Sequence, residues 1–253
     1  MTTKKFVISL FFFIATESSA QTLGGNAVYN FLSQPSSAQV ASLGGINISN
    51  QSNDVSLGLS NPALLRKGMH QQIATSFNGF LAGISNYSAV ASYYQERHQI
   101  NWGIGLQYLH YGNITQTDAT GSILGTFKPN EFALQLLMSK QYNNHFYIGA
   151  AAKFIQSNYG LYRSSGIAMD IGLTYSDTVN QFQAAIVIKN MGTQLSTYGG
   201  SAKEELPFDL QVGISKRLAN APIQFSLTAH NLHRLNILYN DTAFNASEGD
   251  LRT

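Results

Sequence analysis

Two histidines lie close enough in this sequence to raise the question of a metal site. His230 and His233 are three positions apart, in a segment with strand-like alternation. On a β-strand that spacing places the two side chains on opposite faces, which argues against a shared zinc ion. We therefore interpret them as ordinary polar histidines and predict no metal-ligating residue.

The other arrangements that would indicate catalysis or cofactor binding are also weak. Glu204 and Glu205 precede Pro207 in a polar stretch and are interpreted as solvated charges. The glycines of 103–105 lie inside an alternating segment, not between a strand and a helix, which argues against phosphate binding and favours close packing or bending. The sequence has no Gly-Xaa-Ser-Xaa-Gly nucleophile elbow and no convergent Ser/His/Asp set. We predict no catalytic or cofactor-binding residue, no cofactor and no enzymatic activity.

The elements that carry these residues are long segments in which apolar and polar residues alternate. In residues 100–108 every even position is large and apolar or aromatic, and in residues 167–175 every odd position is. Side chains alternate across a strand, so each segment has one apolar and one polar or small-residue face. Strands are predicted at 71–80, 84–95, 99–113, 123–142 (bent or broken near Pro129), 145–158, 164–176, 181–190, 206–217 and 222–233.

These predicted strands are long enough to cross a bilayer. They exceed the roughly five or six residues usual in soluble sheets and match the roughly nine to eleven tilted residues of a transmembrane strand. The charged residues Lys153, Asp170, Lys189 and Asp209 fall on the polar face. The pattern therefore predicts an all-β fold, a transmembrane antiparallel β-barrel with charges inside and an apolar face toward lipid.

Turns and aromatic residues agree with a barrel whose first strand runs outward from the periplasm. Its inner end is then the periplasmic end, and its outer end faces the cell exterior. Short inner turns are predicted at 95–98, 142–144, 176–180 and 216–221, and outer loops at 114–123, 159–163 and 191–205. Six aromatic residues on the apolar face lie near the inner end and would form an interfacial girdle: Tyr93, Trp102, Tyr142, Phe146, Tyr175 and Phe182. The alternative is aromatic core packing in a soluble β-sandwich.

The first twenty residues have the parts of a bacterial export signal. Lys4 and Lys5 precede an apolar run over 6–15, and small residues at 18–20 provide a cleavage site before Gln21. Because these three parts occur in the order typical of an export signal, they favour a signal peptide (1–20) over a buried N-terminal strand. The apolar run is too short for a membrane helix, which needs roughly twenty residues. Localisation in the outer membrane is expected.

Composition supports an exported membrane protein. Charged residues make up 11% of the chain, well below the roughly 25% typical of soluble domains. A net charge of +2 gives no reason to expect nucleic acid as a partner. The absence of cysteine excludes disulfides and thiolate chemistry.

Two further regions flank the expected strands. Residues 21–69 alternate poorly and are interpreted as a periplasmic or lumenal segment, with a short helix at 26–32 and a turn leading into another at 61–65. Residues 70–253 are assigned to the barrel. Only about nine strands are counted, whereas bacterial single-chain barrels have an even number, and the tail at 249–253 is polar. The barrel is therefore expected to be C-terminally incomplete.

Several motifs outside the alternation resemble the PorQ family of the type IX secretion system of Bacteroidetes. That family is related to PorV, and both resemble FadL-like transporters, in which Asn-Pro-Ala is widespread. The matching residues are Gly24–Leu32, Pro35–Ala38, Asn61–Leu65, Leu206–Phe208 and Thr228–Leu232.

The resemblance implies a FadL-like barrel of about 14 strands in the full family and a non-enzymatic role. It implies a scaffold for the surface complex that anchors secreted cargo to lipopolysaccharide, with PorZ-like, sortase-like PorU and PorV-like partners. Loops 114–123 and 191–205 are the expected contact sites. The alternative is a FadL-like transporter of hydrophobic small molecules, which the mostly Ser, Gly, Gln and Asn inner face disfavours.

Overall fold

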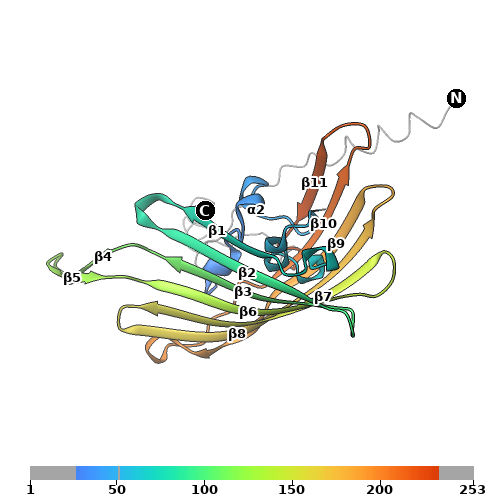
Figure 1. The fold of residues 1–253 in the computed structure, drawn as a ribbon. Helices are drawn as coiled ribbons and strands as arrows, with labels where there is room; N and C mark the ends of the chain where they lie inside the picture. The colour runs from blue at the N-terminus through green and yellow to red at the C-terminus, as the bar shows by residue number, and fades with distance from the viewer. Residues whose placement is uncertain (1–26, 51, 234–253) are drawn as a thin grey trace, which may run out of the picture. The chain divides into compact units, whose positions relative to one another are not determined.

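The fold is all-β and consists mainly of one antiparallel sheet. The computed structural model describes residues 27–50 and 52–233; the predicted signal peptide and the tail at 249–253 lie outside them. Nine strands follow the order β1-β2-β3-β6-β7-β8-β9-β10-β11, and a separate pair, β4-β5, lies between β3 and β6 in the chain (Figure 1). The strands are β1 (Ile73–Gly79), β2 (Ser85–Gln95), β3 (Ile100–His110), β4 (Ile114–Thr117), β5 (Ile123–Phe127), β6 (Asn130–Gln141), β7 (Phe146–Tyr159), β8 (Tyr162–Asp177), β9 (Phe182–Ser196), β10 (Asp209–Arg217) and β11 (Gln224–Ala229).

In residues 27–50 and 52–233, helix is confined to short turns. Most lie before the first strand, in the segment formed by residues 27–50 and 52–69, which we call the N-terminal segment. Among the described residues, no helix is long and apolar enough to cross a membrane. The helical turns are η1 (Asn30–Ser33), α2 (Ala38–Ser42), η2 (Val55–Leu59), η3 (Pro62–Leu64), η4 (Lys67–Met69), η5 (Leu81–Gly83) and η6 (Tyr198–Gly200).

The predicted strands correspond to the nine strands of the large sheet. The predicted break near Pro129 is confirmed, since β5 ends at Phe127 and β6 begins at Asn130. The prediction for 114–123 missed that this region begins the β4-β5 hairpin. The prediction for 181–190 was too short, because a bulge beside Asn190 (φ 56°) lets β9 continue to Ser196.

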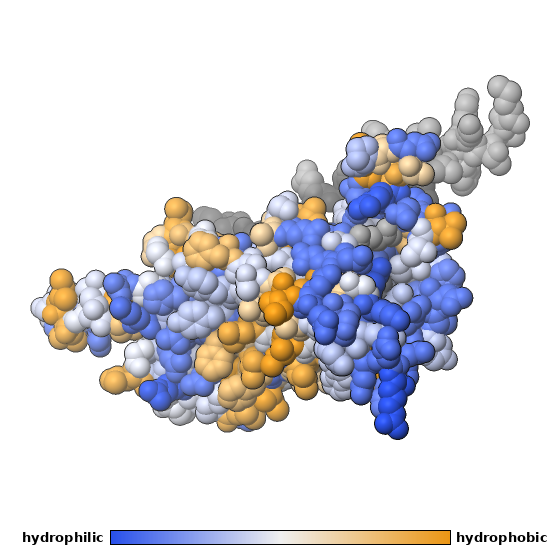
Figure 2. All heavy atoms as spheres, viewed as in Figure 1, coloured by the Kyte–Doolittle hydropathy of each residue, from blue (hydrophilic) through white to orange (hydrophobic). Residues whose placement is uncertain are grey.

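The two faces of the sheet differ as the alternation predicts. We call the face that contacts the N-terminal segment the inner face and the opposite one the outer face. On β6, Glu131 and Gln135 are buried on the inner face, whereas Leu134, Leu136 and Met138 are 41–55% exposed on the outer face. Hydrophobic residues gather over the middle of the sheet in Figure 2, flanked by hydrophilic ones. The apolar side of the sheet is thus the exposed side.

The hydrophobic core lies between the inner face and the N-terminal segment. One cluster joins Leu59 and Leu65 of this segment to Val90 and Leu137 of the sheet. A second joins Phe31 and other N-terminal residues to Leu109, Ala133 and Ile155. In Figure 1 the blue N-terminal turns lie on the concave side of the sheet. The segment therefore fills the interior that the strands curve around.

Glycines on the inner face allow this close approach. A Cβ added to Gly149 would lie 2.3 Å from the backbone nitrogen of Ala63, and one added to Gly105 would lie 2.5 Å from Leu59 Cδ2. Real Cβ atoms do not approach so closely, so a side chain at 149 would displace the backbone of the segment, and one at 105 would displace the side chain of Leu59. The predicted packing role of the glycines at 103–105 is confirmed.

The sheet is open within the described residues. Strands β1 and β11 lie at its two ends, and each pairs with one neighbour there. The four short turns predicted at one end of the strands are confirmed, because the strands on either side of them pair directly in antiparallel register.

Candidate functional site

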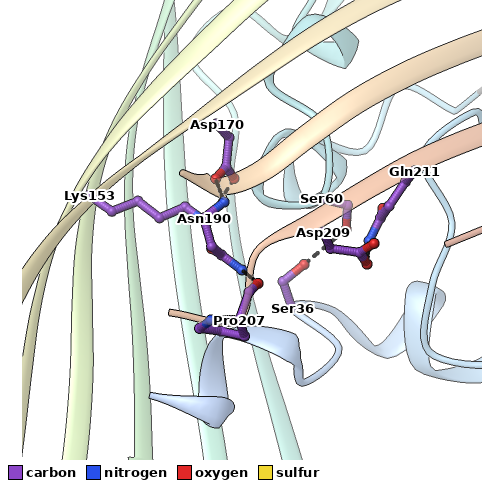
Figure 3. Close-up of polar contacts among 8 residues, drawn as sticks. All are labelled: Ser36, Ser60, Lys153, Asp170, Asn190, Pro207, Asp209 and Gln211. Atoms are coloured by element: carbon purple, nitrogen blue, oxygen red, sulfur yellow. Dashed lines mark hydrogen bonds and ion pairs between the residues drawn. The ribbon is translucent and has the colours of Figure 1, made fainter. Parts of the chain in front are cut away.

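The inner face carries a buried ion pair beside the bulge in β9. Lys153 Nζ lies 2.7 Å from Asp170 Oδ2, and the two side chains are 2% and 1% exposed. Lys153 Nζ also donates to Asn190 Oδ1 at 2.8 Å, while the Asn190 backbone N–H donates to Asp170 Oδ1 at 2.8 Å. Asn190 Nδ2 then donates to the Pro207 carbonyl at 2.9 Å (Figure 3). Each buried charge is therefore compensated and three strands are joined to the chain before β10.

The bulge explains why these groups meet. The β8–β9 register shifts between Met169 and Ile171, which leaves Asp170 without a direct partner on β9. Asn190 adopts a left-handed conformation there (φ 56°), which asparagine tolerates better than most residues. Its backbone N–H consequently turns toward the Asp170 carboxylate instead of a ladder carbonyl.

A second polar cluster surrounds Asp209 at the start of β10. Its carboxylate accepts from Gln211 Nε2 at 2.7 Å and from the Asn231 backbone N–H at 2.6 Å. His230 Nδ1 lies 4.0 Å from the same carboxylate. Lys189, the register partner of Asp209 on β9, is partly buried. Two of the four charges predicted on the polar face, Lys153 and Asp170, are thus fully buried, and the other two are partly so.

Asn61 fixes the N-terminal segment to the strands. Its side chain is completely buried; Nδ2 donates to the Ile48 carbonyl at 2.9 Å and to Thr174 Oγ1 at 3.0 Å. Oδ1 accepts from the Ala63 backbone N–H at 2.9 Å and so caps η3, where Pro62 occupies the first helical position. The short helix predicted after Asn61 is confirmed as this turn.

Tyrosines gather in the interior near the ends of β6 and β7. Tyr29 OH lies 2.5 Å from Ser164 Oγ, and Tyr198 OH donates to Ser157 Oγ at 2.5 Å. Tyr111 OH donates to the buried carboxylate of Glu131. Burial raises the pKa of Tyr29, Tyr111 and Tyr198 above the ordinary value, because it disfavours the phenolate. All three phenols are therefore neutral near pH 7.

The outer face brings together several of the predicted aromatic residues. Tyr93 and Trp102 are register partners on β2 and β3, as are Phe146 and Tyr175 on β7 and β8. The Tyr175 ring lies 5.2 Å from that of Phe146 and 6.3 Å from that of Phe182. These residues form two groups of neighbours on the apolar face.

The histidines and glutamates considered as candidate site residues do not come together in one site. His230 approaches Asp209, whereas the His233 ring packs edge-on against Phe208 with 5.0 Å between centroids. Glu204 and Glu205 are exposed. In the described part of the chain, histidine side chains hydrogen-bond to backbone groups and one asparagine, not to a hydroxyl nucleophile. No group of three or more His, Asp or Glu residues there is arranged to hold a metal ion.

Two features of this interior were not predicted from the sequence. The first is the meeting of Asp170 with Asn190, for which the only signal was an asparagine near the end of a predicted strand. The second is the tyrosine cluster, whose members come from separate parts of the chain. A comparison with known proteins gives no further guide: no protein-family model matches this chain, and no curated protein matches it.

Proposed function

We propose that this protein is a non-enzymatic β-barrel of the bacterial outer membrane whose outer face contacts lipid. The observation that carries the proposal is the inverted distribution of side chains across the sheet. Leu136, Ile148 and Ile186 are 48–55% exposed on the outer face, while Lys153 and Asp170 are almost fully buried on the inner one. Large exposed apolar surfaces on a protein mark contact with a membrane or with another protein.

Charged residues at the two ends of the apolar surface favour contact with lipid over contact with another protein. On the outer face of β8 the residues from Ile167 to Tyr175 are apolar at every second position, and the charged residues Arg163 and Asp177 lie beyond its two ends. A Lys or Arg facing the middle of a bilayer would be unfavourable by about 2–4 kcal/mol, an amount that decreases near the interfaces. An apolar band bounded by charges is what a bilayer of fixed thickness requires.

We propose that the open sheet is part of a closed barrel. Only helices and closed barrels satisfy all backbone polar groups within hydrocarbon. The edges of β1 and β11 would then pair with each other or through further strands. The curvature of the sheet around the N-terminal segment supports this arrangement (Figure 1).

Within the membrane, a scaffold role in the type IX secretion attachment complex is the function we favour. The residues that resemble the PorQ family have identifiable roles in this fold. Asn61 anchors the N-terminal segment, and the Pro207 carbonyl accepts from Asn190 beside the buried ion pair. A plugged interior suits a protein that holds partners at its surface. The partners proposed from the resemblance are PorZ-like, PorU-like and PorV-like proteins.

The β4-β5 hairpin is the contact surface we propose for those partners. Ile123 and Leu124 are 75% and 63% exposed on it. The hairpin begins in loop 114–123, one of the two expected contact sites, and extends beyond it to Phe127. Exposed apolar side chains on a projecting hairpin provide the kind of anchor that protein interfaces bury.

A transporter of hydrophobic small molecules is the second candidate. An apolar groove of about 540 Å³ on the outer face favours it, lined in part by Leu134, Phe154, Met169 and Met191. Against it stands the interior, where the N-terminal segment occupies the space that a substrate would cross. The scaffold and transporter functions differ in whether stable protein partners accompany the chain.

A pull-down from outer membranes in mild detergent, followed by mass spectrometry, tests the proposal. Recovery of the sortase-like peptidase with PorV-like and PorZ-like proteins is expected. A variant with Ile123→Asp and Leu124→Asp should lose them, whereas Leu161→Asp, at a position 95% exposed in a different turn, should retain them. Recovery of the membrane protein alone would favour the transporter, and recovery from the soluble fraction would contradict both.

A further inference from the structure

A cavity of about 380 Å³ lies at one end of the inner face, and aromatic rings make up much of its wall. Its tyrosines come from the N-terminal segment, the chain after β3, β7, β8 and η6. Glu131 and Glu204 also line it. The five tyrosines are Tyr29, Tyr111, Tyr159, Tyr162 and Tyr198.

Three of the tyrosine rings are neighbours, and several hydroxyls already have hydrogen-bond partners. The Tyr159 ring lies 5.6 Å from that of Tyr111 and 5.9 Å from that of Tyr198, the latter edge-on at 82°. The hydroxyls of Tyr29, Tyr111 and Tyr198 are held by Ser164, Glu131 and Ser157. What these residues offer a ligand is therefore mainly the π surface of their rings, which carries partial negative charge.

Glu131 brings a buried carboxyl group to the same cavity. Glu131 is only 2% exposed. Tyr111 donates a hydrogen bond to it, but no Lys, Arg or His nitrogen lies within 4.0 Å of it among the described residues. A buried carboxyl group is ionised only with a cation beside it and otherwise keeps its proton. This one differs from Asp170, whose partner Lys153 is present.

From this combination we propose that the cavity binds a small organic cation with an alkylammonium group. Ammonium groups are attracted to the faces of aromatic rings, and such sites often combine several rings around one cation. A cation in the cavity would stabilise the ionised form of Glu131, which a neutral ligand would not do. A metal ion would need several oxygen or nitrogen ligands, and no group of three or more His, Asp or Glu residues meets in the described part of the chain.

The position of the cavity further limits which ligands can reach it. Glu131, Ser157 and Ser164 belong to the inner face, so the cavity lies on the opposite side of the sheet from the apolar outer surface. The ligand is accordingly a free small molecule and not the headgroup of a lipid packed against the outer face. This binding activity goes beyond the proposed scaffold role and does not depend on the protein partners.

Calorimetric titration of the folded full chain in detergent micelles tests the proposal. The probes are choline and 3,3-dimethylbutan-1-ol, which has the same shape without the charge. Choline should bind with saturation, and the uncharged alcohol should bind at least about tenfold more weakly. Equal affinity for the two probes, or no saturable binding of choline, would overturn the proposal.

Variants assign the binding to this cavity. Glu131→Gln should raise the dissociation constant for choline by about tenfold or more, and Tyr198→Leu should weaken binding while Tyr198→Phe, which retains the ring, preserves it. Glu96→Gln, at an exposed carboxylate in a distant turn, is the matched control and should bind as the wild type does. Circular dichroism verifies the fold of each variant. Unchanged affinity in folded Glu131→Gln or in folded Tyr198→Leu would refute the site.

Discussion

Lys153 on β7 and Asp170 on β8 form an ion pair at 2.7 Å in which both side chains are almost completely buried. Their chain neighbours Phe154, Met169 and Ile171 point the other way and are 38–42% exposed. Over a single residue step, the chain therefore passes from a buried charge to an exposed apolar group. The sheet therefore has charged side chains on its buried face and apolar side chains on its exposed face, the reverse of a soluble protein.

Breaking this ion pair should destabilise the fold strongly. Asp170→Asn leaves the Lys153 ammonium buried without a counter-charge, and we expect a loss of about 3–5 kcal/mol in the free energy of unfolding. The measurement is urea unfolding of the protein in micelles, followed by circular dichroism. Lys67→Met is the control, because its ion pair with Glu96 is long and exposed and should be worth less than about 1 kcal/mol. Similar losses in the two variants would contradict the assignment.

Gly149→Ala should displace the N-terminal segment. The added methyl group would lie 2.3 Å from the Ala63 nitrogen and 2.4 Å from the Pro62 carbonyl carbon. Overpacking of this kind typically destabilises by about 1–3 kcal/mol. Gly79→Ala is the matched control, since its new Cβ would meet nothing closer than 3.7 Å. Unfolding midpoints in urea compare the two, and a tolerated Gly149→Ala would show that the segment does not pack as described.

Loss of the Asn61 amide should loosen the same segment from the sheet. Asn61→Ala removes hydrogen bonds to Ile48, Thr174 and Ala63, a loss of about 2–4 kcal/mol at roughly 1 kcal/mol per bond plus unsatisfied partners. Trypsin cleavage after Arg66, whose side chain donates to Gln183, should become faster. Asn30→Ala, which removes one exposed hydrogen bond, should leave the rate unchanged. Equal rates in the two variants would count against the anchor.

Stability should fall at alkaline pH because of the interior tyrosines. Burial raises the pKa of Tyr29 and Tyr198 in the folded state, so the unfolded chain loses these protons first. Their contribution is complete below the unfolded pKa of about 10 and is lost as the pH rises through the folded values. Melting temperatures measured from pH 8 to 12 should decline above pH 10, less steeply in Tyr29→Phe. An identical slope in that variant would contradict the burial of Tyr29.

The strands and their faces were predictable from sequence because alternation is a local signal. In β6 and β8 each apolar residue identifies its own face, and the polar neighbours between them identify the other. The break at Pro129 was predictable for the same reason, since proline cannot donate to the ladder. Local chemistry was sufficient for these elements, whereas the end of β9 at Ser196 and the β4-β5 hairpin were missed.

The interior contacts were not predictable in this way. Tyr29 meets Ser164 across 135 residues of sequence, and Asn61 meets Thr174 across 113. No periodicity encodes such distances. The bulge at Asn190 depends on the register of two strands and on a single backbone conformation, which cannot be read from the alternation. The proposed cation site depends entirely on contacts of this long-range kind.

The contact of the outer face with lipid is tested most directly by depth-dependent fluorescence quenching. The chain has a single tryptophan, Trp102, within the predicted aromatic girdle. Brominated lipids should quench Trp102 best when the bromines lie near the headgroups. In a Trp102→Phe background, Leu136→Trp should be quenched best by bromines near the bilayer centre. Tyr111→Trp, on the inner side, should be quenched little. Equal quenching at positions 136 and 111, or none at 136, would contradict the lipid-facing assignment.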